Sequence, residues 1–165
     1  MESQNARELD SSLLGCLCDI VVSDLSFISQ TLVFPAISSV LCDGGEFVGE
    51  VLYWEVGGFL YIEHFCVLPS KRNNRYGQKI LEAMQAKPLI LEIDPPTDEM
   101  SMRRKGFYER CGFVENPYHH IHPPYHRGNS GHELVVMSRP KGLTQSEYEM
   151  FAQCLRGTIM KNAYL

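Results

Sequence analysis

The chain has 165 residues, of which 44% are hydrophobic and 21% charged. This length and composition are typical of one globular domain of about 150 residues. A net charge of −5 disfavours a nucleic-acid partner, because such binding depends on phosphate neutralisation. No apolar run approaches the ~20 residues that span a bilayer, and the N-terminus has no basic patch that would open a secretory leader. We therefore expect a single cytoplasmic domain over residues 1–165, with neither a nucleic-acid nor a membrane partner.

The N-terminal quarter of the chain has the weakest pattern. Leu13, Leu14 and Leu17 suit one face of a helix. A second helix is expected over about residues 25–40, where Pro35 interrupts it. The turn-forming sequence Asp43-Gly44-Gly45 follows.

Two strands joined by a tight turn are expected next. Residues 46–56 are rich in aromatic and β-branched residues, and Gly57-Gly58 suits a two-residue hairpin turn. Residues 59–68 form a second strand that is apolar on both faces except at Glu63 and His64. A strand of this kind is expected in the centre of a sheet that helices cover.

A strand–helix–strand–helix segment follows the hairpin. A helix is expected from Tyr76 to a stop at Pro88, and its apolar face comprises Tyr76, Ile80, Leu81 and Met84. Residues 89–93 form the next strand. A helix from about Asp98 then ends at Gly112, a natural glycine cap.

The C-terminal third predicts two further strands and a last helix. A strand begins at residues 113–114, residues 116–131 form a polar loop, and residues 133–137 form the last strand. Thr144 and Glu147 have the spacing of a capping box. The amphipathic helix after them, which could serve a homodimer, has the apolar residues Tyr148, Phe151, Leu155 and Ile159. This order predicts a mixed α/β sheet with one crossover unit at its centre.

The six cysteines predict reduced, mostly buried thiols rather than disulfides or a zinc site. Only Cys16 and Cys18 lie close together, and their C-x-C spacing is not that of a structural zinc site. The others are Cys42, Cys66, Cys111 and Cys154. Without a secretory leader, a reducing compartment is expected.

The junction between residues 67 and 81 has the strongest functional pattern. A central strand ends there, a basic loop follows, and a helix begins. The unpaired N–H groups at a helix start suit a phosphate. Lys71, Arg72 and Arg75 add positive charge, and Gly77 would let a ligand approach the backbone. A plain solvated turn is the alternative.

Two segments resemble a known family. The pattern Val67-x-Pro69-x-x-Arg72-x-x-x-x-Gly77 is similar to the acetyl-CoA-binding motif of the GNAT-superfamily N-acetyltransferases, whose loop reads Q/R-x-x-G-x-G/A. Arg75 stands where that pattern has its first glycine. The sequence Phe107-Tyr108-Glu109-Arg110-Cys111-Gly112-Phe113 is similar to the family's F-Y-x-x-x-G-F segment. The resemblance covers about residues 46–137.

The resemblance implies the GNAT-like acyl-CoA N-acyltransferase fold, a mixed, mostly antiparallel central sheet with flanking helices. It also implies acetyl-CoA as cosubstrate and direct attack of a primary amine on the thioester. The backbone of the central strand would pair with the pantetheine arm, and the loop would bind the phosphates. The cofactor-binding residues are then Phe65, Cys66, Val67, Arg72, Asn73, Asn74, Arg75, Tyr76, Gly77 and Gln78.

Such a reaction needs a base for the amine, whose pKa is near ~10.4, and an acid for the thiolate. Glu63 is the first candidate base, because an unpaired carboxylate on an apolar strand is costly and burial should raise its pKa. Glu92 interrupts the next strand in the same way, and the sequence does not separate the two. A purely structural Glu63 is the alternative. Tyr108 matches the family tyrosine that faces the CoA sulfur, and a packed core tyrosine is its alternative.

Five of the six histidines fall within residues 119–132. A loop on the substrate side, in which His122 or Tyr125 contacts the acceptor, is the favoured interpretation. Metal binding is the alternative, but no acid or cysteine lies within the run, and the sequence predicts no metal site. His64 is expected to be a core histidine. The acceptor is expected to be a small-molecule amine, and an acyl-CoA sensor without turnover is the competing class.

Overall fold

In a computed structural model, residues 48–125 and 128–162 are described. The helices expected near residues 13–17 and 25–40 lie outside these residues. The chain divides into two compact units. Of the described residues, the first unit contains 48–53 and 64–80, and the second contains 54–63, 81–125 and 128–162. The first two strands each contribute residues to both units.

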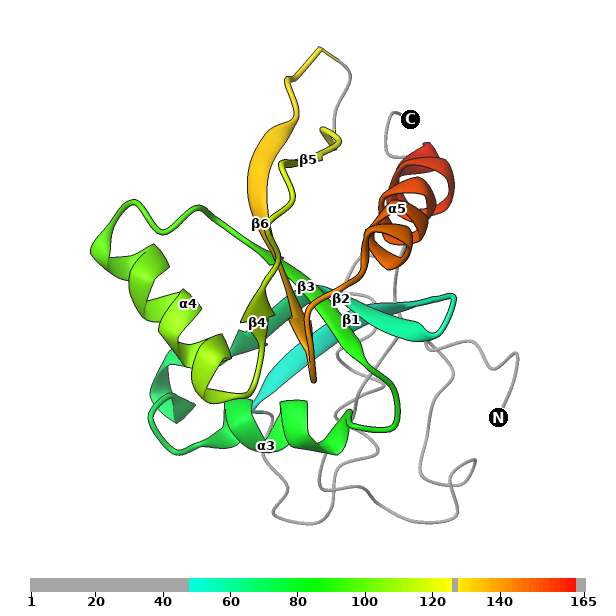
Figure 1. The fold of residues 1–165 in the computed structure, drawn as a ribbon. Coiled ribbons are helices and arrows are strands. Elements are labelled where there is room, and N and C mark those ends of the chain that lie inside the picture. The colour runs from blue at the N-terminus through cyan, green and yellow to red at the C-terminus, as the bar shows by residue number, and fades with distance from the viewer. Residues whose placement is uncertain (1–47, 126–127, 163–165) are drawn as a thin grey trace, which may run out of the picture. The chain divides into compact units, whose positions relative to one another are not determined.

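The described strands form one mixed sheet (Figure 1). Strand β2 pairs with β3 in parallel, whereas β3, β4 and β5 each pair with β6 antiparallel. The order is β1-β2-β3-β6-β4, with β5 also on β6. Their bounds are β1 Gly49–Val56, β2 Phe59–Val67, β3 Leu89–Ile93, β4 Val114–Glu115, β5 His120–His122 and β6 His132–Arg139. The expected mixed, mostly antiparallel sheet with flanking helices is confirmed.

The C-terminal helix closes the core of the second unit. Helix α5, Gln145–Cys154, starts at the predicted capping box of Thr144 and Glu147 and continues as a π-helical turn over Leu155–Ile159. Its apolar residues pack with residues of β1, β2, β3 and β6, and this core includes Val56, Tyr61, Ile90, Val136, Phe151, Leu155 and Ile159. The amphipathic helix is confirmed. Because its apolar face is buried within its own unit, it offers no support to the homodimer, which stays a prediction.

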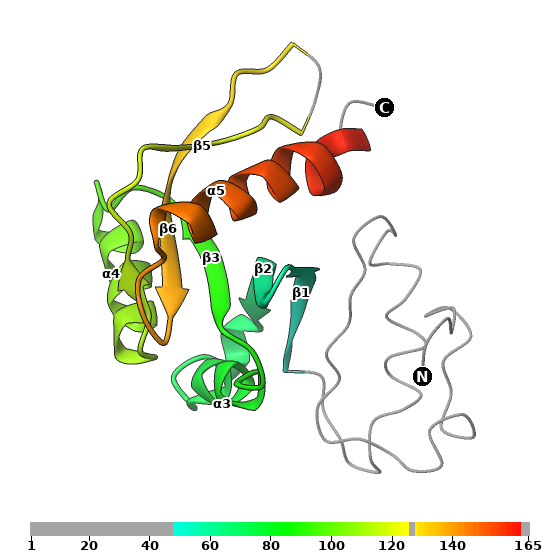
Figure 2. The same cartoon turned by 45° about the vertical axis from the view of Figure 1, so that its right-hand side comes forward.

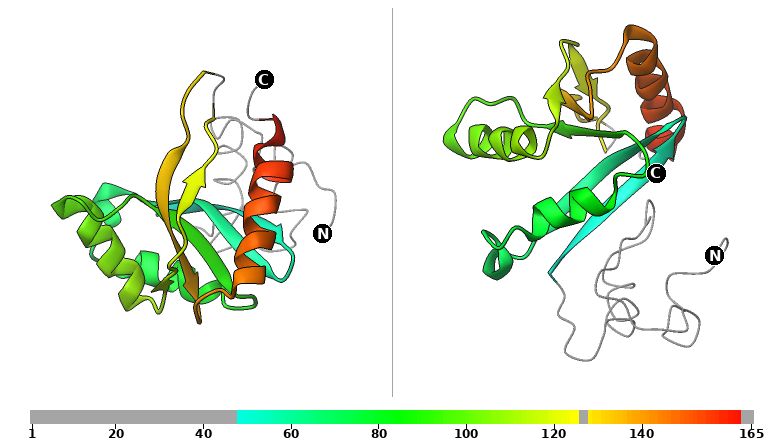
Figure 3. Two further views of the ribbon diagram at one scale, coloured as in Figure 1. Left: turned by 45° about the horizontal axis from the view of Figure 1, so that its top comes forward. Right: turned by 60° about the horizontal axis from the view of Figure 1, so that its bottom comes forward.

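Helix α4, Glu99–Arg110, begins and ends where the sequence predicts. Asp98 caps its N-terminus and exchanges hydrogen bonds with Ser101, and Gly112 follows its C-terminus at a φ of 85°. A glycine accepts that left-handed backbone without strain. Helix α4 packs against β3 and lies on the opposite side of the β3–β6 pair from α5 (Figures 2 and 3).

Helix α3, Tyr76–Ala83, follows a short 3-10 turn over Pro69–Lys71. Ile80, Leu81 and Met84 are buried as expected. The regular helix ends at Ala83, before the expected stop at Pro88. No helix among residues 48–125 and 128–162 is long and apolar enough to cross a membrane.

Three expectations need correction. The loop expected over residues 116–131 contains β5, whose central residue is exposed between two buried histidines. His64 is exposed rather than part of the core, because the second half of β2 buries only one of its faces. The described thiols, Cys66, Cys111 and Cys154, are free, but Cys66 is exposed and the other two are only partly buried.

Candidate functional site

The basic loop after β2, in the first unit, is held by hydrogen bonds to backbone carbonyl groups. The N–H of Leu68 donates to the carbonyl of Val48 at 2.9 Å. The Arg72 Nε–H donates to the carbonyl of Val67 at 3.1 Å. The Asn74 amide donates to the carbonyls of Lys71 at 3.4 Å and Arg72 at 3.3 Å. These contacts give an exposed loop a defined path.

Two residues of this loop adopt the left-handed backbone conformation. The φ of Asn73 is 67° and that of Arg75 is 60°. Asparagine tolerates this region, whereas a residue such as arginine enters it at a cost. Arg75 stands where the motif quoted above has a glycine. Its backbone therefore keeps a conformation that glycine favours, although it carries a side chain.

The start of α3 completes the loop. The N–H of Lys79 donates to the carbonyl of Arg75 at 3.0 Å and closes the first helical turn. The backbone dipoles give this helix start partial positive charge. The exposed guanidinium groups of Arg72 and Arg75 stand in the same loop. A glycine-like backbone, a helix start and two cations together fit phosphate groups.

The backbone at the end of β2 is closely packed on its β1 side. A Cβ added at Gly49 would lie 2.2 Å from the carbonyl oxygen of Cys66, so only glycine fits there. The parallel pairing with β3 covers residues 60–62 and ends before Phe65, Cys66 and Val67. Although the residue as a whole is exposed, partial burial of its sulfur raises the pKa of the Cys66 thiol. The thiol is therefore protonated at neutral pH and is a poor nucleophile.

In the second unit, Glu63 lies on β2 and is half-buried. The indole N–H of Trp54 donates to its Oε2 at 2.7 Å. The Tyr125 hydroxyl donates to its Oε1 at 3.5 Å. Both donors are neutral, and the half-buried carboxylate keeps part of its contact with solvent.

Glu92, on β3, is in a different environment, with a side chain that is only 5% exposed. The Tyr61 hydroxyl donates to its Oε2 at 2.5 Å. The Nε2 of His120 bonds its Oε1, and the Nε2 of His122 lies 3.8 Å from Oε2. His120 also bonds the Tyr148 hydroxyl through Nδ1, at 3.1 Å. A buried carboxylate needs such compensation, and two histidines and a phenol supply it.

Glu63 and Glu92 with the side chains that contact them are called the carboxylate cluster: Trp54, Tyr61, His120, His122 and Tyr125, with Tyr148 bonded to His120. Two tyrosines of this cluster, Tyr61 and Tyr125, have raised pKa values. Burial, and then the Glu92 carboxylate, hold the pKa of Tyr61 well above its usual value. Burial, and then Glu63, raise the pKa of Tyr125. Both hydroxyls therefore stay protonated at neutral pH and act as hydrogen-bond donors.

Tyr108 lies in α4 and is 8% exposed. Its ring makes edge contacts with Phe107 and Phe113, at centroid distances of 5.2 and 5.6 Å. Burial raises the pKa of Tyr108 to about 12. Within the described ranges its hydroxyl makes no hydrogen bond to the protein. A protonated donor is therefore available on the α4 side of the β3–β6 pair.

Comparisons with known proteins identify the family of this chain. Residues 34–115 match the acetyltransferase (GNAT) domain family. A solved structure described as a putative GNAT-family acetyltransferase from Bacteroides thetaiotaomicron is 30% identical, with a TM-score of 0.66, over 73% of this chain and 70% of that one. The chain belongs to the GNAT family of acetyltransferases. A crystal structure of a Bacillus subtilis acetyltransferase in complex with CoA matches at 14% identity and a TM-score of 0.43, over 58% of this chain and 70% of that one. No curated protein matches the chain.

Acetyl-CoA, expected above from the sequence, is the acetyl donor of GNAT acetyltransferases. The loop that fits phosphate in this GNAT chain has the residues of the family motif, with Arg75 as the departure. The glycine-like φ of Arg75 explains how the backbone path is kept.

The histidine-rich segment of the GNAT chain gives no support to metal binding. In the part of the chain that the structure describes, no group of three or more potential ligands could hold a metal ion. His120 uses both ring nitrogens within the protein, and His122 uses Nδ1 to bond the Pro123 carbonyl at 2.6 Å. His122 and Tyr125 stack on each other at a centroid distance of 5.1 Å, so the two expected substrate-side residues are in contact.

Sequence reasoning missed four residues of the cluster: Trp54, Tyr61, His120 and Tyr148. Of these four residues, only His120 lies in a sequence pattern that could have predicted its burial. His120, Ile121 and His122 alternate in burial with the period of a strand, but two histidines do not look like core residues in a sequence. The other three become partners only through the sheet and α5.

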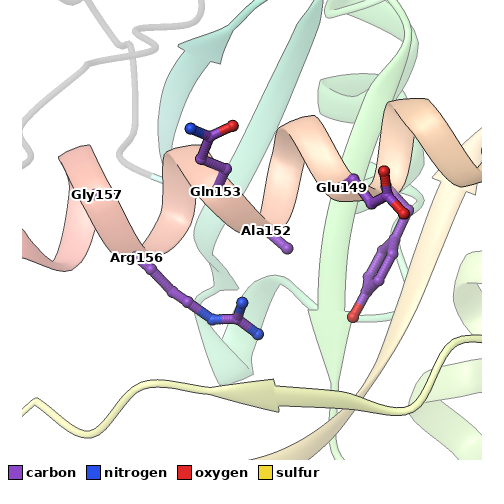
Figure 4. Close-up of a pocket in the computed structure, with 6 residues that line it drawn as sticks. Glu149, Ala152, Gln153, Arg156 and Gly157 are labelled. Atoms are coloured by element: carbon purple, nitrogen blue, oxygen red, sulfur yellow. The ribbon is translucent and has the colours of Figure 1, made fainter.

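A pocket of about 430 Å³ lies along α5, lined by Tyr148, Glu149, Ala152, Gln153, Arg156 and Gly157 (Figure 4). It contains neither Glu63 nor Glu92. Its connection to the cluster is the Tyr148 hydroxyl, which bonds His120. The pocket is therefore adjacent to the cluster rather than part of it.

Proposed function

We propose that this chain transfers the acetyl group of acetyl-CoA to a primary amine of a small molecule. The observation that carries the proposal is the pair of carboxylates on neighbouring strands, Glu63 and Glu92, in contact with Tyr125, Tyr61 and His120. Cofactor binding alone requires no carboxylate on these strands. Removal of a proton from an ammonium group requires a base, because the attacking amine must be neutral, and Glu63 is a carboxylate that keeps solvent contact.

The first unit supplies the groups that would hold the donor. Acetyl-CoA supplies the acetyl group as an activated thioester. Arg72, Arg75 and the start of α3, with Tyr76, Gly77 and Gln78, would bind its phosphates, while Asn73 and Asn74 shape the loop. The backbone of Phe65, Cys66 and Val67, beyond the β2–β3 pairing, would bond the pantetheine amides as an added strand does.

The two carboxylates suit different roles. Glu63 is half-buried and keeps solvent contact, so it can take a proton from the amine, directly or through water. Glu92 is 5% exposed, and Tyr61 and His120 bond its two oxygens. Water and a soluble amine therefore reach Glu63 more readily than Glu92. Glu63 is the proposed base, and Glu92 is the carboxylate that holds His120.

Tyr108 suits hydrogen-bond donation to the thiolate rather than full proton transfer. With a pKa of about 12, it is a weak acid at neutral pH. A donor hydrogen bond still stabilises charge on sulfur as the thioester breaks.

The acceptor side is proposed to include His122 and Tyr125, next to Glu63. A net charge of −5 favours a cationic acceptor. We retain two further proposals. A cytoplasmic location is supported by the free thiols Cys66, Cys111 and Cys154. A single domain is supported by strands that contribute to both units.

The test measures CoA thiol release with acetyl-CoA and a panel of polyamines, amino acids and aminoglycosides, and identifies the acetylated product by mass spectrometry. Calorimetry with CoA runs in parallel. Thiol release that requires an amine, with an acetylated amine as product, supports the proposal. CoA binding without turnover on any amine would instead favour an acyl-CoA sensor.

A further inference from the structure

The pocket along α5 follows from the spacing of residues on this helix. Residues four positions apart are neighbours on one face of a helix. The six residues that line the pocket form two rows with this spacing, Tyr148–Ala152–Arg156 and Glu149–Gln153–Gly157. Figure 4 shows the side chains of Ala152 and Arg156 on the same side of the helix. Because the small Ala152 lies between two long side chains, a hollow opens above it.

The helical turn that contains Arg156 and Gly157 is wider than an α-helical turn. Leu155–Ile159 is a π-helical segment directly after α5. Such segments are rare and are frequent at functional sites. Leu155 and Ile159 are buried in the core of the second unit, whereas Arg156 and Gly157 are exposed. The π-helical turn therefore keeps its apolar residues in the core and leaves Arg156 and Gly157 at the pocket.

Arg156 supplies a positive charge that the described part of the chain does not pair. Its guanidinium makes no hydrogen bond or ion pair with any residue in the ranges 48–125 and 128–162. Burial raises the pKa of Tyr148, and the charge of Arg156 opposes this rise, so the guanidinium and the phenol lie near each other. A guanidinium offers a planar fork of N–H donors that matches the two oxygens of a carboxylate.

The protein already occupies other polar groups of the pocket. The Tyr148 hydroxyl donates to the carbonyl of His119 at 3.3 Å and bonds Nδ1 of His120 at 3.1 Å. Oε1 of Glu149 accepts from the amide of Gln145 at 2.7 Å. Among the groups that line the pocket, the guanidinium of Arg156 is therefore the charged donor that a ligand can engage.

Glu149 is the acidic residue of the pocket, and its place favours one orientation of a ligand. It lies seven residues before Arg156, which is about 10 Å along the axis of a helix with a rise of 1.5 Å per residue. An anionic group is therefore favoured at the Arg156 end and disfavoured at the Glu149 end. The apolar surface of Ala152 lies between the two ends.

We propose that the pocket along α5 binds a small organic carboxylate, whose two oxygens accept hydrogen bonds from Arg156 while its apolar part lies over Ala152 and beside Gly157. The volume of about 430 Å³ is in the range of small-molecule sites. Neither Glu63 nor Glu92 lines the pocket, so this site is additional to the proposed site of acetyl transfer.

The first test uses benzoate as the probe and NMR of the isotope-labelled full chain as the readout. Benzoate should give saturable shifts at the backbone of Ala152 and Gly157 and at the side chain of Arg156. Benzamide has the same ring without the charge and should bind about 10-fold more weakly or less, because hydrogen bonds between charged groups are the stronger ones. Inorganic phosphate lacks the apolar part and should also bind more weakly than benzoate. Equal affinity for benzoate and benzamide, or shifts confined to other parts of the chain, would overturn the proposal.

The second test removes the charge. Arg156→Gln keeps an amide donor and should lower the affinity for benzoate about 10-fold or more. Lys161→Gln is the matched control, because it removes one positive charge from an exposed residue that does not line the pocket, and it should keep the wild-type affinity. An equal loss in both variants would mean that net charge attracts benzoate and that the pocket is no specific site.

The third test fills the pocket. A Cβ added at Gly157 would meet no atom within 4 Å, so Gly157→Leu fits the described protein and should abolish benzoate binding. Thr158→Leu adds similar bulk at the next exposed residue, outside the lining, and should bind benzoate as the wild-type protein does. Retained binding in Gly157→Leu would contradict the site, and if this variant fails to fold, Arg156→Gln and Lys161→Gln decide it. Each readout is binding, so the outcome does not depend on whether the chain acetylates an amine.

Discussion

The basic loop of the first unit and the carboxylate cluster of the second are built in opposite ways. The loop is exposed, and its bonds join residues two to five positions apart in the chain. The cluster centred on Glu92 is buried and joins residues 28 to 31 positions apart. Changes in the loop should therefore act on cofactor binding with only small effects on stability, whereas changes in the cluster should alter stability and turnover together.

The largest expected effect is on the stability of the cluster. Glu92→Gln removes the carboxylate that bonds Tyr61 and His120. Each buried hydrogen-bonding group left unsatisfied costs about 1–3 kcal/mol, and urea unfolding measures the loss. Glu92→Gln with wild-type stability would show that the cluster does not depend on this carboxylate.

Glu63→Gln is the matched change on the neighbouring strand. The Glu63 side chain is half-exposed, so Glu63→Gln should lower the free energy of unfolding far less than Glu92→Gln does. Turnover should fall by about 100-fold or more, the usual contribution of a general base. The indole of Trp54 can still donate to the amide oxygen, so the local geometry is kept. Unchanged turnover would instead make Glu63 structural and return the base role to Glu92.

Tyr108→Phe should lower kcat about 10-fold and leave the affinity for CoA nearly intact, because it removes one hydrogen bond to developing charge. Weaker CoA binding in this variant would contradict the assignment.

The raised pKa of Tyr108 also predicts how the stability of the wild-type protein depends on pH. Below pH 10 the buried phenol is neutral in both folded and unfolded chains, so its contribution is complete. As pH rises from 10 toward about 12, the unfolded chain ionises first and stability falls. Tyr108→Phe should therefore lose less stability than the wild-type protein over that pH interval.

Local chemistry made the loop predictable from sequence. The strand that ends at Pro69, the basic residues and the helix start lie within a short segment, and the motif places Arg72 and Gly77 directly. The capping boxes of Asp98 and Thr144 are equally local. The sheet pattern followed from residue periodicity.

The cluster was only half predictable for the same reason. Glu63 and Glu92 stand out because each interrupts an apolar strand. Their partners do not, since Tyr61 and Tyr148 resemble ordinary core residues in a sequence. The sequence predicts a loop instead of strand β5, because histidines fill the buried positions of that strand. Its burial depends on Glu92 and Tyr148, which only the fold brings to it.

In the loop, Arg72→Ala should weaken CoA binding about 5-fold, since an exposed charge–charge contact contributes about 1 kcal/mol. The effect should shrink with added salt. Pantetheine, which lacks the nucleotide phosphates, is the matched ligand and should bind equally to both proteins in calorimetry. Equal weakening for both ligands would remove Arg72 from the phosphate site.

The smallest effect separates backbone from charge at Arg75. Arg75→Gly and Arg75→Ala both remove the guanidinium, but only glycine accepts a φ of 60° without strain. The glycine variant should therefore be more stable than the alanine variant by about 1 kcal/mol in urea unfolding. Asn73→Gly should gain less over Asn73, because asparagine already tolerates its φ of 67°. Equal stability of Arg75→Gly and Arg75→Ala would mean that the left-handed conformation is not kept in solution, and the loop would then lose the feature that most closely links it to the family motif.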